Sequence, residues 1–169
     1  MFYRITGLDP SQYRPLFDLS DQELASRGMV RMTVTQKPGF PCRITLEDRE
    51  VGEQVLLLNH VSQEDGPYRA SHAIFVSDGT PASFVDEVPP VFNDRVLSLR
   101  AFDHEGMMVE AALAQPGEAD AVIRSLLANE LLDHIDAHNA TRGCFSARIE
   151  RSSAQKRQAQ MVSQANGNV

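Results

Sequence analysis

The sequence predicts a single α+β domain, mainly antiparallel sheet, with two short helices. A chain of 169 residues is long enough to build one domain around a substantial core. Its strand-like segments follow one another too closely for helical crossovers, which favours antiparallel neighbours. Only two segments carry a helical pattern. Strands this short allow a strongly curved or barrel-like sheet.

The first half of the chain predicts one helix among several strands. An alternating segment at 2–6 predicts a strand that ends before Gly7. Residues 19–28 predict a helix, because Ser20 and Glu23 form a capping-box pattern and Gly28 suits a left-handed C-terminal position. Six strand candidates follow, separated by turns rich in Pro, Gly and Asp: 30–35, 42–46, 54–60, 70–77, 95–102 and 107–113.

The second helix and a last hairpin complete the fold. Acidic residues at 118 and 120 precede an apolar stripe at 122, 123, 126 and 127, which predicts a helix. Strands are predicted at 133–139 and 144–150, with a turn at 140–143.

The register of this hairpin decides which side chains meet. Pairing His138 with Phe145 mixes polar and apolar residues on both faces. The register that keeps the faces separate pairs His138 with Cys144, Asp136 with Ser146 and His134 with Arg148. We therefore expect the second register.

Composition excludes several classes of function. The net charge is −7, and three positive charges lie after residue 150 without acidic neighbours, so residues 1–150 carry −10. Without a basic block, we expect neither nucleic-acid binding nor attachment to an anionic membrane. The longest aliphatic run, 55–58, is too short to span a bilayer, and the first residues lack the apolar segment of a signal peptide. Two distant cysteines indicate reduced thiols and a cytoplasmic protein. We expect a domain over 1–151 and a flexible polar, slightly basic tail over 152–169.

The polar face of the last hairpin is the first candidate for chemistry. A histidine beside Cys144 would favour the thiolate, and Asp136 would orient an imidazole. The simpler interpretation is the solvent-exposed face of an edge hairpin, since antiparallel sheets commonly expose one polar face. No nucleotide-binding loop, nucleophile elbow or metalloprotease helix occurs in the sequence.

Other reactive residue types have structural interpretations. Cys42 shares a face with Ile44 and Leu46, which favours a small buried hydrophobe over a nucleophile. His72 also shares a face with apolar residues, so a core histidine with a satisfied hydrogen bond is expected, and a functional histidine is the alternative. Cysteine and histidine bind zinc, and Cys42, His72, His138 and Cys144 are of these types. Structural zinc sites use closely spaced ligand pairs, which the sequence lacks, so we expect no metal site. Arg100 is either an anion-binding group or an ordinary surface arginine.

Several blocks in order carry a family resemblance: 37–43, 55–59, 67–75, 97–109 and 137–144. Over about residues 2–151, the chain resembles the bacterial domain-of-unknown-function 1203 family. The resemblance brings no established activity or cofactor. It implies that the family-typical positions are Cys42, Arg43, Asn59, Tyr68, Ser71, His72, Arg100, Asp103, His138, Asn139 and Cys144. His134 and Asp136 are not among them, which shifts weight to His138, Asn139 and Cys144.

Two hypotheses of different classes follow. The first is a small-molecule-binding or enzymatic domain, with Cys144, His138 and His72 as catalytic residues. Its ligand is small and anionic or polar, and the ligand-binding residues are Asn139, Asn59, Tyr68, Arg43, Arg100 and Asp103. The second is a non-catalytic structural or interaction domain, such as a homodimer, in which these residues tie turns to the sheet. Convergence of His72, His138, Cys144 and Arg100 around one cleft would favour the first.

Overall fold

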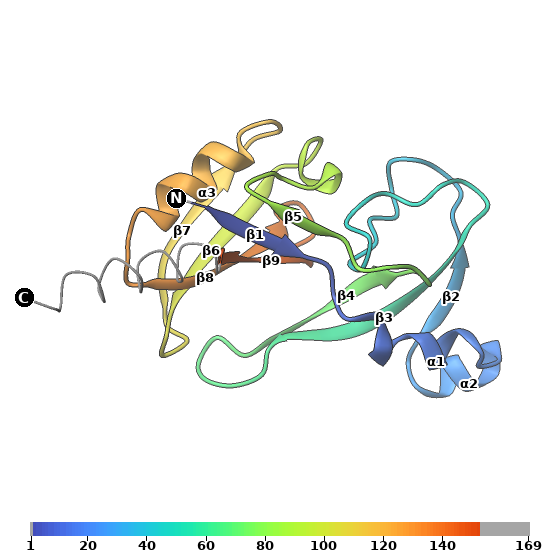
Figure 1. Ribbon diagram of the computed structural model, residues 1–169. Helices are drawn as coiled ribbons and strands as arrows, with labels where there is room; N and C mark the ends of the chain where they lie inside the picture. Colours follow the sequence, from blue (N-terminus) through green and yellow to red (C-terminus); the bar gives the residue numbers. More distant parts are fainter. Residues whose placement is uncertain (1, 153–169) are drawn as a thin grey trace, which may run out of the picture.

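The computed structural model describes residues 2–152, which form two open antiparallel sheets and three short α-helices (Figure 1). The larger sheet has the order β5 (Ser83–Val85), β1 (Tyr3–Thr6), β9 (Phe145–Arg151), β8 (Leu132–Asn139), β6 (Leu97–Asp103) and β7 (Met108–Ala114). The smaller has the order β2 (Val30–Thr33), β3 (Gln54–Gln63) and β4 (Ala70–Val76). Every strand pair is antiparallel, which confirms the predicted fold class, and neither sheet closes into a barrel.

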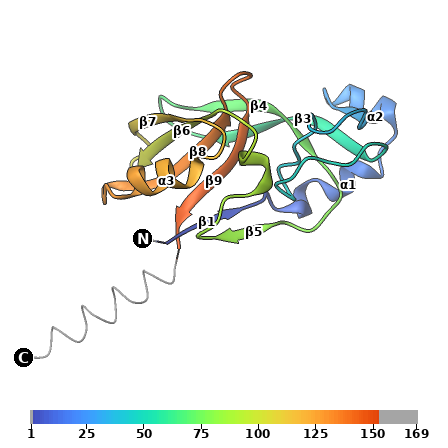
Figure 2. The same ribbon diagram turned by 90° about the horizontal axis from the view of Figure 1, so that it is seen from above.

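The helices lie at opposite ends of the molecule (Figures 1 and 2). Helices α1 (Arg14–Phe17) and α2 (Asp21–Ser26) lie beside the smaller sheet, and α3 (Ala119–Leu127) lies on the larger one. The predicted capping box of α2 is confirmed: the Glu23 amide donates to Ser20 Oγ, and the Ser20 amide donates to a Glu23 carboxylate oxygen. Gly28 has the expected positive φ of 72°. The one-turn helix α1 was not predicted.

Each sheet has its own apolar core. Alternate residues of β6 and β8 are buried together with the apolar stripe of α3: Leu97, Leu99, Ala101, Ile135, Ala137, Ile123, Leu126 and Leu127. The smaller sheet buries Leu56, Leu58, Ile74 and Val76 against Leu24 of α2. The two cores lie on different sides of the larger sheet. The smaller sheet therefore packs against the face of the larger sheet that does not contact α3.

That other face carries the polar residues of the last hairpin, and the prediction that it faces solvent at an edge is wrong. Strand β8 lies between β6 and β9, and His134, Asp136 and His138 are all buried. Strands β3 and β4 of the smaller sheet cover them: Arg148 of β9 donates 2.9 Å to the Ser62 carbonyl, and the His72 and His138 rings lie 4.9 Å apart. Both faces of β8, at the centre of the larger sheet, are therefore covered by protein.

The predicted register of the hairpin is also wrong. Asp136 pairs with Arg148, His134 with Glu150, and His138 with Phe145. The amide of Asn139 donates to the Cys144 carbonyl, which sets the turn, and the register then shifts between Ala137 and His138 so that Ser146 is an extra residue. This bulge places Arg148 opposite Asp136 and allows Phe145 to join the core of the smaller sheet.

The remaining differences concern short segments. Residues 42–46 are not a strand: they belong to the long loop between β2 and β3, with only single bridges from Pro41 to Asp48 and from Cys42 to Phe75. The three-residue strand β5 was not predicted. No helix within residues 2–152 is both long and apolar enough to cross a membrane. The predicted tail, apart from Ser152, lies outside the described residues.

Candidate functional site

A cleft of about 880 Å³ lies where the long loop before β3, strand β4 and the β8–β9 turn meet. Four of the predicted site residues line it: Arg43, His72, Asn139 and Cys144. Arg95 and Arg142 line it as well, and the sequence analysis did not select either of them. One feature of the sequence could have pointed to Arg142: it stands in the predicted turn, two residues before Cys144.

Cys144 stands at the start of β9 and is half-buried. Its Sγ accepts hydrogen bonds from Arg43 Nη2 at 3.4 Å and from Asn139 Nδ2 at 3.6 Å. The turn that presents it is closed by the Gly143 amide, which donates to the Asn139 carbonyl, and Gly143 has a φ of 72° that favours glycine. Two nitrogen donors directed at one sulfur stabilise a thiolate more than a thiol.

Arg43 is buried at the floor of the cleft, with 2% of its surface exposed. Its Nε donates 2.8 Å to the Phe145 carbonyl, and Nη1 donates to the Pro41 carbonyl. Within residues 2–152 no carboxylate forms an ion pair with Arg43. Burial lowers the pKa of Arg43, and its interaction with Cys144 acts in the opposite direction. Within residues 2–152, Cys144 Sγ is therefore the one side-chain acceptor of Arg43, whose other acceptors are backbone carbonyls.

His138 is buried behind the cleft rather than on its surface. Its Nδ1 lies 3.1 Å from the Gly143 carbonyl, which can only accept, so Nδ1 carries the proton. Burial, and next the charge of Arg100, lower the pKa of His138 to about 4. The imidazole is neutral at pH 7, and its hydrogen bond holds the turn beside Cys144.

His72 and His60 extend the layer of imidazoles between the sheets. They pair across β3 and β4, and His60 Nδ1 lies 3.1 Å from the Tyr13 hydroxyl. Burial lowers the pKa of both groups, assisted by Arg100 at His72 and by His72 at His60. His72 Nε2 is buried and has no hydrogen-bond partner within residues 2–152, unlike the satisfied core histidine that was expected.

The other predicted ligand-binding residues do not line the cleft. Asn59 is exposed on β3, and the Tyr68 ring packs edge-on against Phe102. The Asp103 carboxylate accepts the amides of Glu105 and Met107 and so closes the β6–β7 hairpin. Arg100 stands opposite Asp136 across β6 and β8 and acts on the imidazoles only through its charge.

An ion pair between buried Asp136 and partly exposed Arg148 joins the two sheets behind the cleft. The Asp136 carboxylate accepts two hydrogen bonds from Arg148, at 2.8 and 3.0 Å, and is almost completely buried. The same guanidinium donates to the Ser62 carbonyl and to Gln63 Oε1. Sequence analysis grouped Asp136 with Arg148 on one face but did not identify this bridge, because the contact to β3 spans 86 residues.

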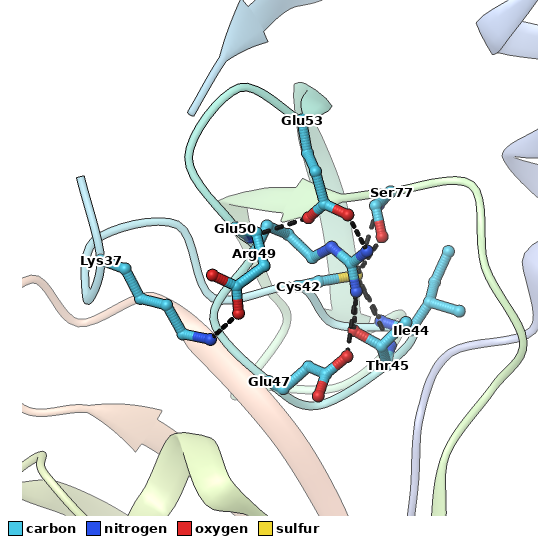
Figure 3. Close-up of polar contacts among 9 residues, drawn as sticks. All are labelled: Lys37, Cys42, Ile44, Thr45, Glu47, Arg49, Glu50, Glu53 and Ser77. Atoms are coloured by element: carbon cyan, nitrogen blue, oxygen red, sulfur yellow. Dashed lines mark hydrogen bonds and ion pairs between the residues drawn. The ribbon is translucent and has the colours of Figure 1, made fainter. Parts of the chain in front are cut away.

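Cys42 is buried as predicted, but its sulfur is a polar centre of the loop. Figure 3 shows it surrounded by the amides of Ile44 and Thr45 and by Ser77. Sγ accepts the amides of Ile44 and Ser77 at 3.3 Å and lies 3.1 Å from Ser77 Oγ. Cys42 is thus an acceptor that organises the loop that carries Arg43.

The fold and cleft define an α+β protein in which two packed antiparallel sheets hold a cysteine against a buried arginine. The chain belongs to the family described as protein of unknown function (DUF1203), whose model matches residues 39–151. That range contains Arg43, His72, Asn139 and Cys144, and it confirms the resemblance seen in the sequence. No match was found among curated proteins or among solved structures.

Proposed function

We propose that this protein is an enzyme that binds a small polar or anionic molecule in the cleft and uses Cys144 as its nucleophile. The observation that carries the proposal is the hydrogen bond from Arg43 to Cys144 Sγ, made by a buried guanidinium that has no carboxylate partner within residues 2–152. A thiolate, rather than a thiol, is the reactive form of cysteine. The reduced thiol that this chemistry needs fits the cytoplasmic location predicted from the cysteine content.

The histidines have different roles in this proposal. His138 is a positioning residue, because its hydrogen bond from Nδ1 holds Gly143 next to the nucleophile. His72 lines the cleft as a neutral imidazole, and its Nε2 is buried without a hydrogen-bond partner within residues 2–152. Asn139 holds Sγ through Nδ2, while its Oδ1 is buried without a partner within the described residues.

The rate of alkylation of Cys144 tests the proposal. With iodoacetamide at pH 7, we expect Cys144 in the folded protein to react about tenfold faster or more than free cysteine, because Arg43 and Asn139 donate hydrogen bonds to its sulfur. Asn139→Ala removes one donor and should lower this rate, while Asn59→Ala, on an exposed site outside the cleft, should not. Cys144→Ser shows how much labelling comes from buried Cys42. A folded protein that reacts no faster than free cysteine would contradict the proposal.

A second candidate function is a non-catalytic homodimer. Strand β7 is an edge of the larger sheet, and Val109 and Leu113 on it are 45% and 63% exposed. An open edge with apolar side chains can pair with the same strand of a second copy. Sedimentation equilibrium distinguishes the two: a dimer that dissociates in Leu113→Glu, with slow alkylation of Cys144, would favour this function.

A further inference from the structure

We propose that the substrate of the cleft is a small anion bearing carboxylate or phosphoryl oxygens, and that Arg142 is the residue that binds this anion. The inference rests on the proposed function, because it names the substrate class of the same cleft.

The charge of the cleft is opposite to that of the protein. The chain has a net charge of −7, yet three arginines line the cleft, Arg43, Arg95 and Arg142, against one acidic residue, Asp94. Two of these arginines already have partners in the protein, so the attraction for an anion comes from Arg142, set in an otherwise acidic surface. Neutral polar molecules would gain nothing from this arrangement.

Two of the three arginines are already engaged. Arg95 is held by Asp48 in a two-pronged ion pair at 2.7 and 2.8 Å, so its charge is balanced. Arg43 donates to two carbonyls and to Cys144. Arg142 differs from both, because within residues 2–152 it forms no ion pair. It is the guanidinium left to meet a bound anion.

Arg142 is also close to the nucleophile along the chain. It stands two residues before Cys144 in the turn whose backbone is held by Asn139 and by His138. A substrate anion bound there would bring its reacting atom to the sulfur, and its body would meet the apolar part of the lining, Leu57, Phe75 and Val96. The cleft thus suits an anion with a short apolar body.

Two alkylating reagents that differ only in charge test the inference. Cys144 Sγ attacks the methylene carbon of iodoacetate or iodoacetamide; the sulfur–carbon bond forms, the carbon–iodine bond breaks, and iodide leaves. We expect the iodoacetate-to-iodoacetamide rate ratio at Cys144 to exceed that of free cysteine by about tenfold, a modest electrostatic enhancement. High salt should lower the iodoacetate rate and leave the iodoacetamide rate unchanged.

Arg142→Gln should return the ratio to that of free cysteine; the ratio is the readout because any change in the reactivity of the sulfur itself affects both reagents alike. The matched control is Arg69→Gln, an exposed arginine in the β3–β4 loop, which should change neither rate. An unchanged ratio in Arg142→Gln, with fast iodoacetamide labelling, would overturn the anion inference and leave the nucleophile standing. Slow labelling by both reagents would instead overturn the proposed function.

A binding measurement that does not use the Cys144 thiol tests the anion inference even if both reagents label slowly. In Cys144→Ser, succinate and inorganic phosphate should each raise the melting temperature, since a ligand bound to the folded state stabilises it. Succinamide, which is neutral, should not. The same anions should raise the melting temperature of the double variant Cys144→Ser/Arg142→Gln less. An equal rise in melting temperature would overturn the assignment of Arg142, because such a rise is a general salt effect.

Discussion

Replacement of His138 by asparagine should remove much of the acid sensitivity of this protein. The imidazole is 2% exposed and donates from Nδ1 to the Gly143 carbonyl. Burial, followed by the charge of Arg100, lowers its pKa from 6.5 to about 4. Between these values the unfolded chain takes up a proton that the folded protein does not, so acid favours unfolding. The stability contributed by the neutral imidazole is complete above 6.5 and is lost as the pH falls towards about 4.

The size of the effect follows from the gap between the two pKa values of His138. At about 1.4 kcal/mol for each pH unit, a fall from 6.5 to about 4 removes roughly 3 kcal/mol from the free energy of unfolding. His60 and His72 also have lowered pKa values and act in the same direction. When His138 is replaced, these two histidines still make the free energy of unfolding depend on pH, but less steeply.

Urea unfolding of both proteins between pH 7 and pH 4 measures this difference. Asparagine places an amide nitrogen near the position of Nδ1, so the bond to Gly143 can be kept while the titrating group is lost. His104→Asn, which replaces an exposed imidazole, serves as the control and should keep the His138 contribution. Wild type should lose roughly 3 kcal/mol more than His138→Asn over this range. Parallel curves for the two proteins would refute the reasoning.

Denaturant unfolding of three single-residue variants tests contacts that stabilise the fold. Cys42→Ala removes an acceptor of buried amides and should cost about 1–3 kcal/mol, while Cys42→Ser should recover most of it; equal losses would contradict the polar role of the sulfur. Asp136→Ala leaves the partly exposed Arg148 without its carboxylate and should cost about 2 kcal/mol, and adding Arg148→Met should restore part of that loss. Gly7→Ala would place Cβ 1.8 Å from the Ile44 carbonyl oxygen and should cost more than about 2 kcal/mol; a neutral effect would show that the loop moves freely.

Features held by contacts between near neighbours in sequence were predictable. Ser20 and Glu23 cap α2 from three residues apart, and the β6–β7 turn closes through Asp103 and the amides two and four residues later. Burial of Cys42 was also predictable, because its neighbours Ile44 and Leu46 are apolar. In the capping box and the β6–β7 turn the partners stand within a few positions of one another, whereas the Cys42 sulfur also meets Ser77, 35 positions away.

The hairpin register was not predictable in the same way. Alternation of polar and apolar residues assumes that each strand has one buried and one exposed face. Here β8 is central, both its faces are covered, and Ser146 is an extra residue, so separating polar from apolar side chains no longer selects the register. The ion pair between Asp136 and Arg148 is formed only after that shift.

By itself, the sequence determined the antiparallel α+β class, most strand positions and the family, because periodicity, turn residues and ordered motifs are properties of short segments. Tertiary structure decided which polar residues meet. Arg43 reaches Cys144 across 101 positions, and Asn59, Tyr68 and Asp103 are left outside the cleft. Hydrogen bonds and ion pairs act over only a few ångströms. Contacts between distant segments therefore form only where the packing of the two sheets brings those segments together.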